Sequence, residues 1–262
     1  MIVIKYGGHV LEDSAANDQI VAAIADFHLQ GGEVLLVHGG GPAIDAELEV
    51  HQIENSTISG YRVTTAAVME VVQRTLSGTV LRDLVNKFIA CGVNAVGLST
   101  GDGNTLRATR YMPTVDGLKI DIGLVGEARS VDPTFLNLLL KNQYLPVISP
   151  VAVQSDGLAL NINGDIAAGA IAGALDADEV IFITDVPGIF RNWPDPESLI
   201  ARISLAELQE IVTTFTGGMA PKVRAVTTAL TSGAKQARII DGRSTANLAL
   251  AFRGLGGTVI TP

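Results

Sequence analysis

Glycine turns that follow short apolar runs, one of them beside a lysine, are the first features of this sequence that could do chemistry. Lys5 precedes Gly7-Gly8, and a second turn, Gly39-Gly40-Gly41, follows the run 34–37. Consecutive backbone N–H groups before a helix start bind anions, and glycine lets the backbone approach a ligand closely. If 2–5 and 34–37 are adjacent parallel strands, both turns lie at the carboxyl edge of the sheet, where open α/β folds bind ligands. This predicts a phosphate site; the alternative is that the glycines only form turns.

The glycine turns do not match the common phosphate-binding fingerprints. The dinucleotide pattern G-x-G-x-x-G could begin at Gly39, but it meets Ile44 where the last glycine is required. The P-loop pattern, a glycine followed after four residues by Gly-Lys-Ser/Thr, does not occur in the sequence. The sequence therefore supports neither a standard dehydrogenase nor a P-loop kinase.

Polar residues near two expected helix starts form two further candidates. Asn161 and Asn163 alternate at a strand end, and Asp165 opens a helix. The simpler interpretation is that Asp165 is the N-cap and the asparagines shape the turn. In the segment 216–222, Lys222 lies in the first turns of a helix, where the dipole disfavours a cation. It is either a solvated lysine or a lysine that meets an anion at the helix start.

A fourth candidate is the segment 60–64, in which Arg62 lies shortly before an expected helix. A guanidinium there could hold a carboxylate by two hydrogen bonds, and a surface arginine paired with a nearby acid is equally compatible. His38 is expected to fix the glycine loop rather than transfer protons. Cys91 is expected to be a small buried residue at a helix end. The four histidines and the single cysteine show no metal-ligand spacing, so no metal site is expected.

Composition excludes several classes of protein. The 262 residues carry 18 basic and 27 acidic side chains, a formal charge of −9, and 47% of them are hydrophobic. Such a chain is too apolar to be disordered and too acidic for a surface that binds nucleic acid by neutralising phosphates. One cysteine cannot form an intramolecular disulfide, and no apolar run approaches the roughly 18 residues of a membrane span. The first residues lack the order of a signal peptide, so we expect a cytoplasmic protein.

Strand-like runs alternate with helical segments along the chain, which predicts an α/β fold. The expected strands are 2–5, 34–37, 95–98, 145–148, 158–162, 180–183, 238–240 and 258–261. The expected helices are 14–29, 42–50, 65–90, 134–140, 166–175, 205–212, 219–231 and 245–252. The helix 65–90 is expected to have Thr64 as its N-cap and a break near Gly78. This order favours a three-layer αβα sandwich with a central, mostly parallel sheet. The turn-rich segment 102–129 predicts β-hairpin excursions. The sequence pattern changes near residue 175, so we divide the chain into two lobes, residues 1–175 and residues 176–262.

With these segments the chain closely resembles the amino-acid kinase family. The similar stretches are Lys5-Tyr6-Gly7-Gly8, Val37-His38-Gly39-Gly40-Gly41-Pro42, Gly60-Tyr61-Arg62-Val63-Thr64, Leu160-Asn161-Ile162-Asn163-Gly164-Asp165, Thr184-Asp185-Val186-Pro187-Gly188-Ile189, Gly217-Gly218-Met219 through Lys222, and Ile239-Ile240-Asp241-Gly242-Arg243. Each stretch alone is weak evidence. Seven in family order over nearly the whole chain are specific.

The resemblance implies that the side-chain carboxylate of N-acetylglutamate attacks the γ-phosphorus of MgATP, a step of arginine biosynthesis. By this resemblance Lys5 faces the phosphoryl group, Lys222 faces the leaving side and Asp165 orients both. Glycine N–H groups contact the phosphoryl group and substrate, and Arg62 and Asn161 hold the substrate. The substrate side is then Gly40, Gly41, Arg62 and Asn161, and the nucleotide side is Gly7, Gly8, Asp185, Pro187, Gly188 and Thr216. Lobe 1–175 would bind the acyl amino acid and dimerise, and lobe 176–262 would bind the nucleotide.

Two departures and three rivals qualify the resemblance. His9 stands where an asparagine or small residue is expected, and Arg238 stands where arginine-inhibited members tend to have a histidine. Arg238 and a first strand that begins at Ile2 predict a homodimer that arginine does not inhibit. The apolar stripe Leu76, Val80, Leu84 and Phe88 could face a dimer partner or the chain's own core. The rivals are a kinase of carrier-protein-linked aminoadipate, a carbamate kinase and a non-catalytic amino-acid sensor.

Overall fold

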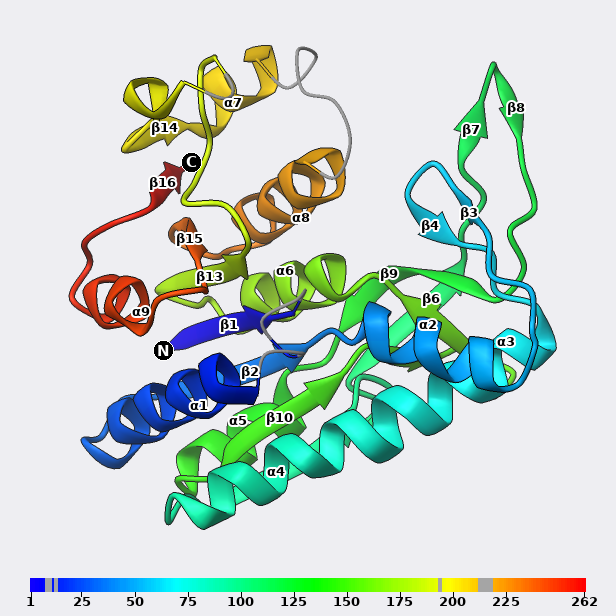
Figure 1. Ribbon diagram of the computed structural model, residues 1–262, viewed down its shortest axis with the longest axis horizontal. Helices are drawn as coiled ribbons and strands as arrows, with labels where there is room; N and C mark the ends of the chain where they lie inside the picture. The colour runs from blue at the N-terminus through cyan, green and yellow to red at the C-terminus, as the bar shows by residue number, and fades with distance from the viewer. Residues whose placement is uncertain (8–10, 12–13, 193–194, 212–218) are drawn as a thin grey trace.

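The computed structural model describes residues 1–7, 11, 14–192, 195–211 and 219–262, with the side chains of 219–221 left aside. Its centre is an eight-stranded sheet (Figure 1). In spatial order the strands are β14 (Arg202–Ser204), β16 (Thr258–Thr261), β15 (Ala237–Asp241), β13 (Glu179–Thr184), β1 (Ile2–Tyr6), β2 (Val34–His38), β10 (Leu145–Ser149) and β5 (Ala95–Ser99). Neighbours are parallel except β15 and β16, which are antiparallel. The predicted mostly parallel sheet is confirmed.

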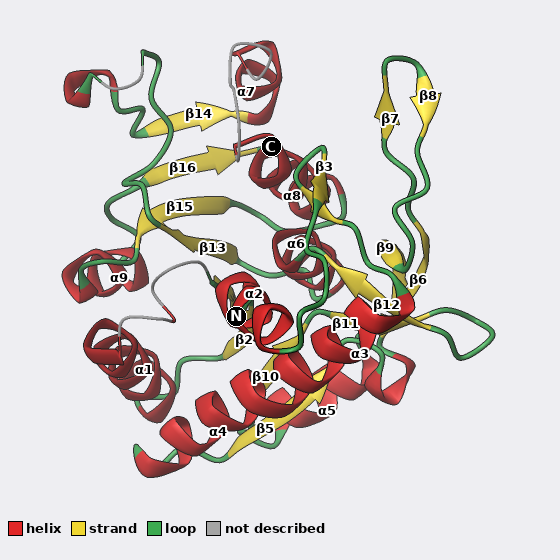
Figure 2. Cartoon of the chain, turned by 45° about the vertical axis from the view of Figure 1, so that its right-hand side comes forward, coloured by secondary structure: helices red, strands yellow, loops and turns green. Residues whose placement is uncertain are grey.

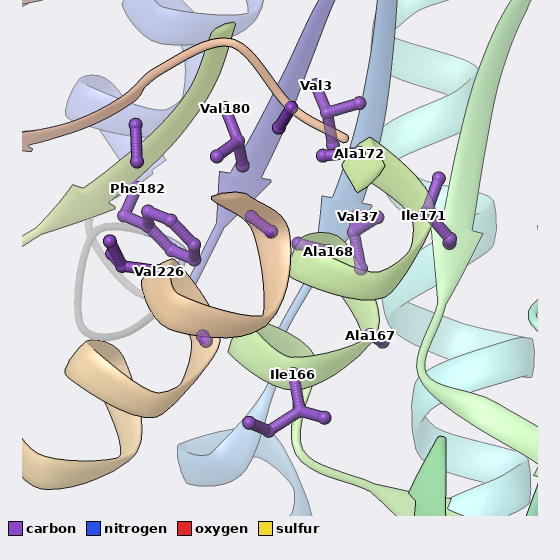
Figure 3. Close-up of a cluster of buried hydrophobic side chains, with 14 of the residues drawn as sticks. Val3, Val37, Ile166, Ala167, Ala168, Ile171, Ala172, Val180, Phe182 and Val226 are labelled. Carbon is purple, nitrogen blue, oxygen red and sulfur yellow. The ribbon is translucent and has the colours of Figure 1, made fainter. Parts of the chain in front are cut away.

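Helices cover both faces of this sheet, because its central strands are apolar on both sides. One face packs against α1 (Ser14–Leu29), α4 (Leu81–Ala90) and α9 (Thr245–Phe252). The other packs against α5 (Thr134–Lys141), α6 (Gly164–Ala174), α7 (Leu205–Ile211) and α8 (Met219–Thr231). Figure 3 shows Val3 and Val37 of the sheet near the alanines of α6, and Phe182 of the sheet beside Val226 of α8. The predicted αβα sandwich is therefore confirmed.

A small barrel lies beside the sheet (Figure 2). It is closed by β6 (Leu106–Arg110), β9 (Val125–Val131), β11 (Val151–Val153) and β12 (Ala159–Ile162). Two hairpins project near it, β3 (Thr57–Ile58) with β4 (Tyr61–Arg62), and β7 (Thr114–Val115) with β8 (Leu118–Lys119). The β7–β8 hairpin lies in the segment 102–129, where hairpins were predicted. The β3–β4 hairpin and the barrel that joins β6 and β9 to β11 and β12 were not predicted. Short 3₁₀ turns occupy Asp102–Asn104 and Pro196–Ser198.

The helical segment after residue 64 differs from its prediction. It runs as α3 (Ala66–Gln73), a π-helical turn (Arg74–Val80) and α4, so the predicted break near Gly78 is wrong. Thr65 is the N-cap, because its side chain accepts from Val68 N at 3.3 Å. Thr64, the predicted cap, is fully buried and donates its backbone N–H to Ile122.

The apolar stripe of this segment faces the chain's own core. Leu76, Leu84 and Phe88 are at most 2% exposed, and Val80 packs against the same side of the sheet as Leu84. This is the core interpretation of the stripe, and it excludes these side chains as a free dimer surface. Cys91 is exposed, so its predicted burial is wrong: it caps the exposed C-terminal end of α4 before Gly92 turns the chain at φ 84°. Within the described residues, no helix is both long and apolar enough to cross a membrane.

Candidate active site

Gly7 and the second glycine turn meet at the carboxyl edge of the sheet, as the sequence predicts. β1 and β2 are neighbouring parallel strands, and Gly39 donates its N–H to Tyr6 O at 2.7 Å. A Cβ atom at Gly7 would lie 2.6 Å from Lys5 Nζ and 3.5 Å from Gly39 Cα. Glycine at position 7 thus lets the lysine amine fold over the turn. Gly8 and His9 lie outside the described residues.

Two lysines from distant parts of the chain flank Asp165. Lys5 Nζ lies 2.9 Å from Asp165 Oδ1, and Lys222 Nζ lies 3.5 Å from Asp165 Oδ2. Lys5 comes from the end of β1, Asp165 from the first turn of α6, and Lys222 from the first turn of α8. All three side chains are less than one-fifth exposed. The structure therefore brings together the three residues to which the resemblance assigns catalysis.

Asp165 can meet the lysines because another residue caps its helix. Asn163 Oδ1 accepts from Asp165 N at 2.8 Å and from Ile166 N at 3.3 Å, so Asn163 is the N-cap of α6. The simpler interpretation of Asp165 as the cap is wrong. With the helix start satisfied by Asn163, the carboxylate of Asp165 points toward the two ammonium groups.

Charge around Asp165 favours an anion. Burial disfavours the ionised carboxylate, but Lys5 and Lys222 outweigh burial and hold the pKa of Asp165 below its usual range. Two ammonium groups and one carboxylate leave an excess of one positive charge in a largely buried place. The carboxyl edge also adds N–H groups at the start of α2 (Gly41–Val50), which opens at Gly41 after Gly40.

Arg62 and Asn161 belong to one hydrogen-bonded group. Asn161 Nδ2 donates to Thr64 Oγ1 at 3.2 Å, and Thr64 Oγ1 donates to Arg62 O at 2.9 Å. Arg62 Nη2 lies 2.6 Å from Asp45 Oδ1 and 3.4 Å from Gly41 O. The predicted substrate residues Gly41, Arg62 and Asn161 are therefore neighbours.

Sequence reasoning missed the residues that hold Arg62. Asp45 of α2 forms the ion pair, and Asn55 accepts a hydrogen bond from Arg62 and donates one to Asp45. Neither residue stands at a fixed spacing from Arg62 that a motif would record. The interpretation of Arg62 as paired with a nearby acid is correct in this structure, and a ligand carboxylate would compete with Asp45.

His38 fixes the second glycine turn. The side chain is fully buried, and Nδ1 lies 2.7 Å from Gly39 O. Because a carbonyl only accepts, Nδ1 carries the proton in the tautomer that fits this contact. Burial lowers the pKa of His38 to about 4, so the ring is neutral at physiological pH. This agrees with the predicted role in fixing the loop.

Three of the residues predicted for the nucleotide, Asp185, Pro187 and Gly188, follow β13, the neighbour of β1 at the same edge. Asp185 is exposed and Pro187 is partly buried. Gly188 is buried, and a Cβ atom there would lie 2.3 Å from Thr258 Oγ1, so packing against β16 requires glycine. Thr216 lies outside the described residues, so its predicted role is not placed by the structure.

Comparison with known proteins agrees with this arrangement. A family model described as the amino acid kinase family matches residues 1–241. The acetylglutamate kinase of Corynebacterium urealyticum is 39% identical over 257 residues, which cover 98% of this chain and 84% of that protein. The acetylglutamate kinase of Methanothermobacter thermautotrophicus is 41% identical over 272 residues, which cover 99% of this chain and 92% of that protein.

Solved structures share the fold. The structure of smu.665 from Streptococcus mutans has a TM-score of 0.81 at 29% identity and covers 99% of this chain and 98% of that one. Carbamate kinase from Giardia lamblia bound to AMP-PNP has a TM-score of 0.69 at 20% identity, covering 99% and 97%. With a family model over most of its length and relatives near 40% identity, the chain belongs to the amino acid kinase family.

Proposed function

We propose that the protein transfers the γ-phosphoryl group of ATP to the side-chain carboxylate of N-acetyl-L-glutamate in arginine biosynthesis. The products are N-acetylglutamyl 5-phosphate and ADP. The observation that carries the proposal is the grouping of Lys5, Asp165 and Lys222 at the carboxyl edge of the sheet. Near-full-length relatives named acetylglutamate kinase support this choice of substrate.

The chemistry requires positive charge rather than a general base. A glutamate side chain has an ordinary pKa near 4.3, so the attacking carboxylate is already ionised at neutral pH. The transition state spreads negative charge over the moving phosphoryl group, and positioned cations stabilise that charge. In this proposal Lys5 contacts the phosphoryl group, Lys222 the leaving oxygen, and Asp165 holds both ammonium groups in place. Backbone N–H groups at Gly7 and Gly8 assist on the phosphoryl side.

The acceptor would bind on the Arg62 side of this group. Arg62 would exchange Asp45 for the substrate's α-carboxylate, and Asn161 would bind the amide region. Gly40 and Gly41 would donate N–H groups at the start of α2. The short path from Arg62 through Thr64 to Asn161 supports a shared binding site.

ATP would lie along the ends of β1 and β13, beside Asp185, Pro187, Gly188 and Thr216. A related kinase structure with bound AMP-PNP supports ATP as the donor. Magnesium would arrive with the nucleotide, because phosphate oxygens are among its usual ligands. It would keep several of its water ligands. Among the described residues, no group of three His, Cys, Asp or Glu side chains could hold a metal ion.

We further propose a cytoplasmic homodimer that arginine does not inhibit. Exposed apolar side chains at the ends of α1, α4 and α5, namely Leu29, Ile89 and Tyr144, support an interface at this end of the molecule. Light scattering would test the dimer, and a hexamer would contradict it. Inhibition by physiological arginine would contradict the second part.

One assay tests the main proposal. Coupled ADP release is measured with MgATP and N-acetylglutamate, beside glutamate, N-acetylaspartate and aminoadipate, and the acyl phosphate is trapped as a hydroxamate. We expect product with N-acetylglutamate and far less with the other acceptors. A preference for an aminoadipate substrate would support the carrier-protein rival, and no hydroxamate from any acceptor would overturn the enzyme proposal.

A further inference from the structure

Away from the lysine pair, three side chains meet around Arg224 of α8. Arg224 Nη1 donates to Tyr61 Oη at 3.0 Å, and Arg224 Nη2 donates to Glu127. The guanidinium carbon lies 4.9 Å from the centre of the Tyr111 ring. The rings of Tyr61 and Tyr111 are 4.8 Å apart and tilted by 48°. We call Arg224, Tyr61, Tyr111 and Glu127 the Arg224 clasp.

The clasp joins the elements that carry two of the cations of the proposed site, Arg62 and Lys222. Tyr61 is next to Arg62 on β4, and Lys222 is two residues before Arg224 on α8. Residues two apart in a helix project from nearly opposite sides. Lys222 accordingly reaches Asp165 while Arg224 reaches the barrel, where Glu127 lies on β9 and Tyr111 follows β6. Figure 2 shows α8 and the β3–β4 hairpin on the same side of the molecule.

The opposite side of α8 is held by close packing against α6. A Cβ atom at Gly169 would lie 2.5 Å from Ala225 O, and one at Gly173 would lie 2.3 Å from Ser232 Cβ. Both α6 glycines therefore let the two helices approach closely. This packing fixes how near α8 lies to Asp165, and the clasp adds a second attachment on the side of Arg62.

The clasp is suited to setting geometry more than stability. The side chains of Arg224 and Glu127 are 39% and 28% exposed, and ion pairs this accessible stabilise a fold little. The planar guanidinium, however, has its directions fixed at once by a hydroxyl, a carboxylate and a ring face. A lysine has no planar fork and could not satisfy all three contacts in the same way.

We propose that the Arg224 clasp is a positioning device that couples Lys222 on the phosphoryl side to Arg62 on the acceptor side. This inference rests on the proposed function for the roles of Lys222 and Arg62. When the clasp is intact, the two cations keep the separation that a bound ATP and acyl amino acid require. Misplacing a reacting group by about 1 Å costs on the order of 10²-fold in rate, so losing the clasp lowers turnover although no clasp residue touches the reacting atoms.

Kinetics of matched variants tests the clasp. We expect Arg224→Ala to lower kcat by about 10–100-fold and to raise the KM for N-acetylglutamate more than the KM for ATP. Arg224→Lys keeps the charge but not the fork and recovers only part of the loss, and Tyr61→Phe, which keeps the ring contact with Tyr111, gives a smaller loss. Arg110→Ala, an exposed arginine next to Tyr111, is the control and stays at wild-type values.

A double-mutant cycle distinguishes a positioning role of the clasp from general damage to the fold. Because Tyr61 acts through Arg224, adding Tyr61→Phe to Arg224→Ala costs nothing further, whereas independent effects would add. Thermal unfolding of each variant confirms that it is folded. A folded Arg224→Ala whose kcat/KM stays within about twofold of wild type, or additive losses in the double variant, would overturn the proposal.

Hydrogen exchange gives a readout that needs no substrate. In Arg224→Ala, amides of the β3–β4 hairpin and of the first half of α8 should both exchange faster, while those of α1 stay unchanged. If the wild type does not phosphorylate N-acetylglutamate, the proposed function fails but this comparison still tests the clasp. Unchanged exchange in both segments would overturn the clasp alone.

Discussion

Asp165 and Glu179 are both buried carboxylates paired with basic side chains, yet their pKa values move in opposite directions. The Asp165 side chain is 8% exposed and that of Glu179 is 7% exposed. Burial disfavours the charged form of each. At Asp165 two lysines outweigh burial and the pKa falls, whereas at Glu179 burial outweighs Arg238 and Gln236 and the pKa rises.

The number of cations distinguishes a site for an anion from a structural ion pair. Glu179 begins β13, at the amino edge of the same sheet, and Arg238 Nε donates to it at 2.8 Å. Arg238 is 1% exposed and donates a further hydrogen bond to Gly256 O at 2.6 Å. The charge of Arg238 is balanced by Glu179, and both of these hydrogen-bond donors find acceptors within the chain. Asp165 leaves one lysine charge unmatched at the carboxyl edge, where an incoming phosphoryl group can use it.

The largest expected effect is on stability at the amino edge. Arg238→Ala leaves Glu179 buried without its cation, so we expect the free energy of unfolding to fall by about 3–5 kcal/mol. Urea unfolding measures this loss, and kcat of the folded variant should stay unchanged. The control is Glu179→Leu with Arg238→Met, which removes both charges and should stay near wild-type stability. A loss below about 1 kcal/mol would mean that the pair behaves like an exposed one.

The next effect is on catalysis at the carboxyl edge. Lys222→Ala and Lys5→Ala should each lower kcat by about 10²–10³-fold with little change in either KM, because their contacts strengthen in the transition state. Steady-state kinetics with MgATP and N-acetylglutamate provides the measurement. Lys235→Ala is the matched control, since Lys235 pairs with Asp178 on the surface at 2.5 Å. A lysine variant with wild-type kcat would remove that lysine from its assigned role.

The sequence predicts the fold of the sheet well because its signals are local. Apolar runs ending in glycine turns locate β1 and β2, and both lie within a residue of their predicted bounds. The barrel was missed because β6 and β9 pair with β11 and β12, segments that are distant in sequence. The π-helical turn at Arg74–Val80 was also missed, since no propensity distinguishes it from an α-helix or a break.

The residues of the candidate site likewise fall into those that the sequence indicated and those that it missed. Glycine turns and the resemblance indicated Lys5, Asp165 and Lys222, and the structure brings these three together although 57 residues separate Asp165 from Lys222. Their individual roles stay predictions. Asp45, Asn55 and the Arg224 clasp were not found, because such contacts depend on tertiary packing that leaves no fixed spacing. Polar partners of a motif residue are therefore the part of a site that one sequence shows least.

The smallest expected effect is the order in which the two carboxylates take up protons. On acidification Glu179 should protonate first, because its pKa lies above the ordinary value of 4.5, and Asp165 last, because its pKa lies below 3.8. The folded protein holds the Asp165 proton less readily than the unfolded chain, so the stability from this group is present at neutral pH and is lost as pH falls through its lowered pKa. For Glu179 the sign is reversed, and acidification through its raised pKa relieves a cost.

Carbon-13 NMR of labelled carboxyl groups measures both titrations, and a tenfold change in an acid dissociation constant corresponds to about 1.4 kcal/mol. If the number of cations sets the difference, Lys222→Ala should move the pKa of Asp165 toward that of Glu179, because each carboxylate then faces a single cation. Lys235→Ala should leave both values in place. If the pKa values of Asp165 and Glu179 stay equally far apart in Lys222→Ala, something other than the second lysine lowers the pKa of Asp165.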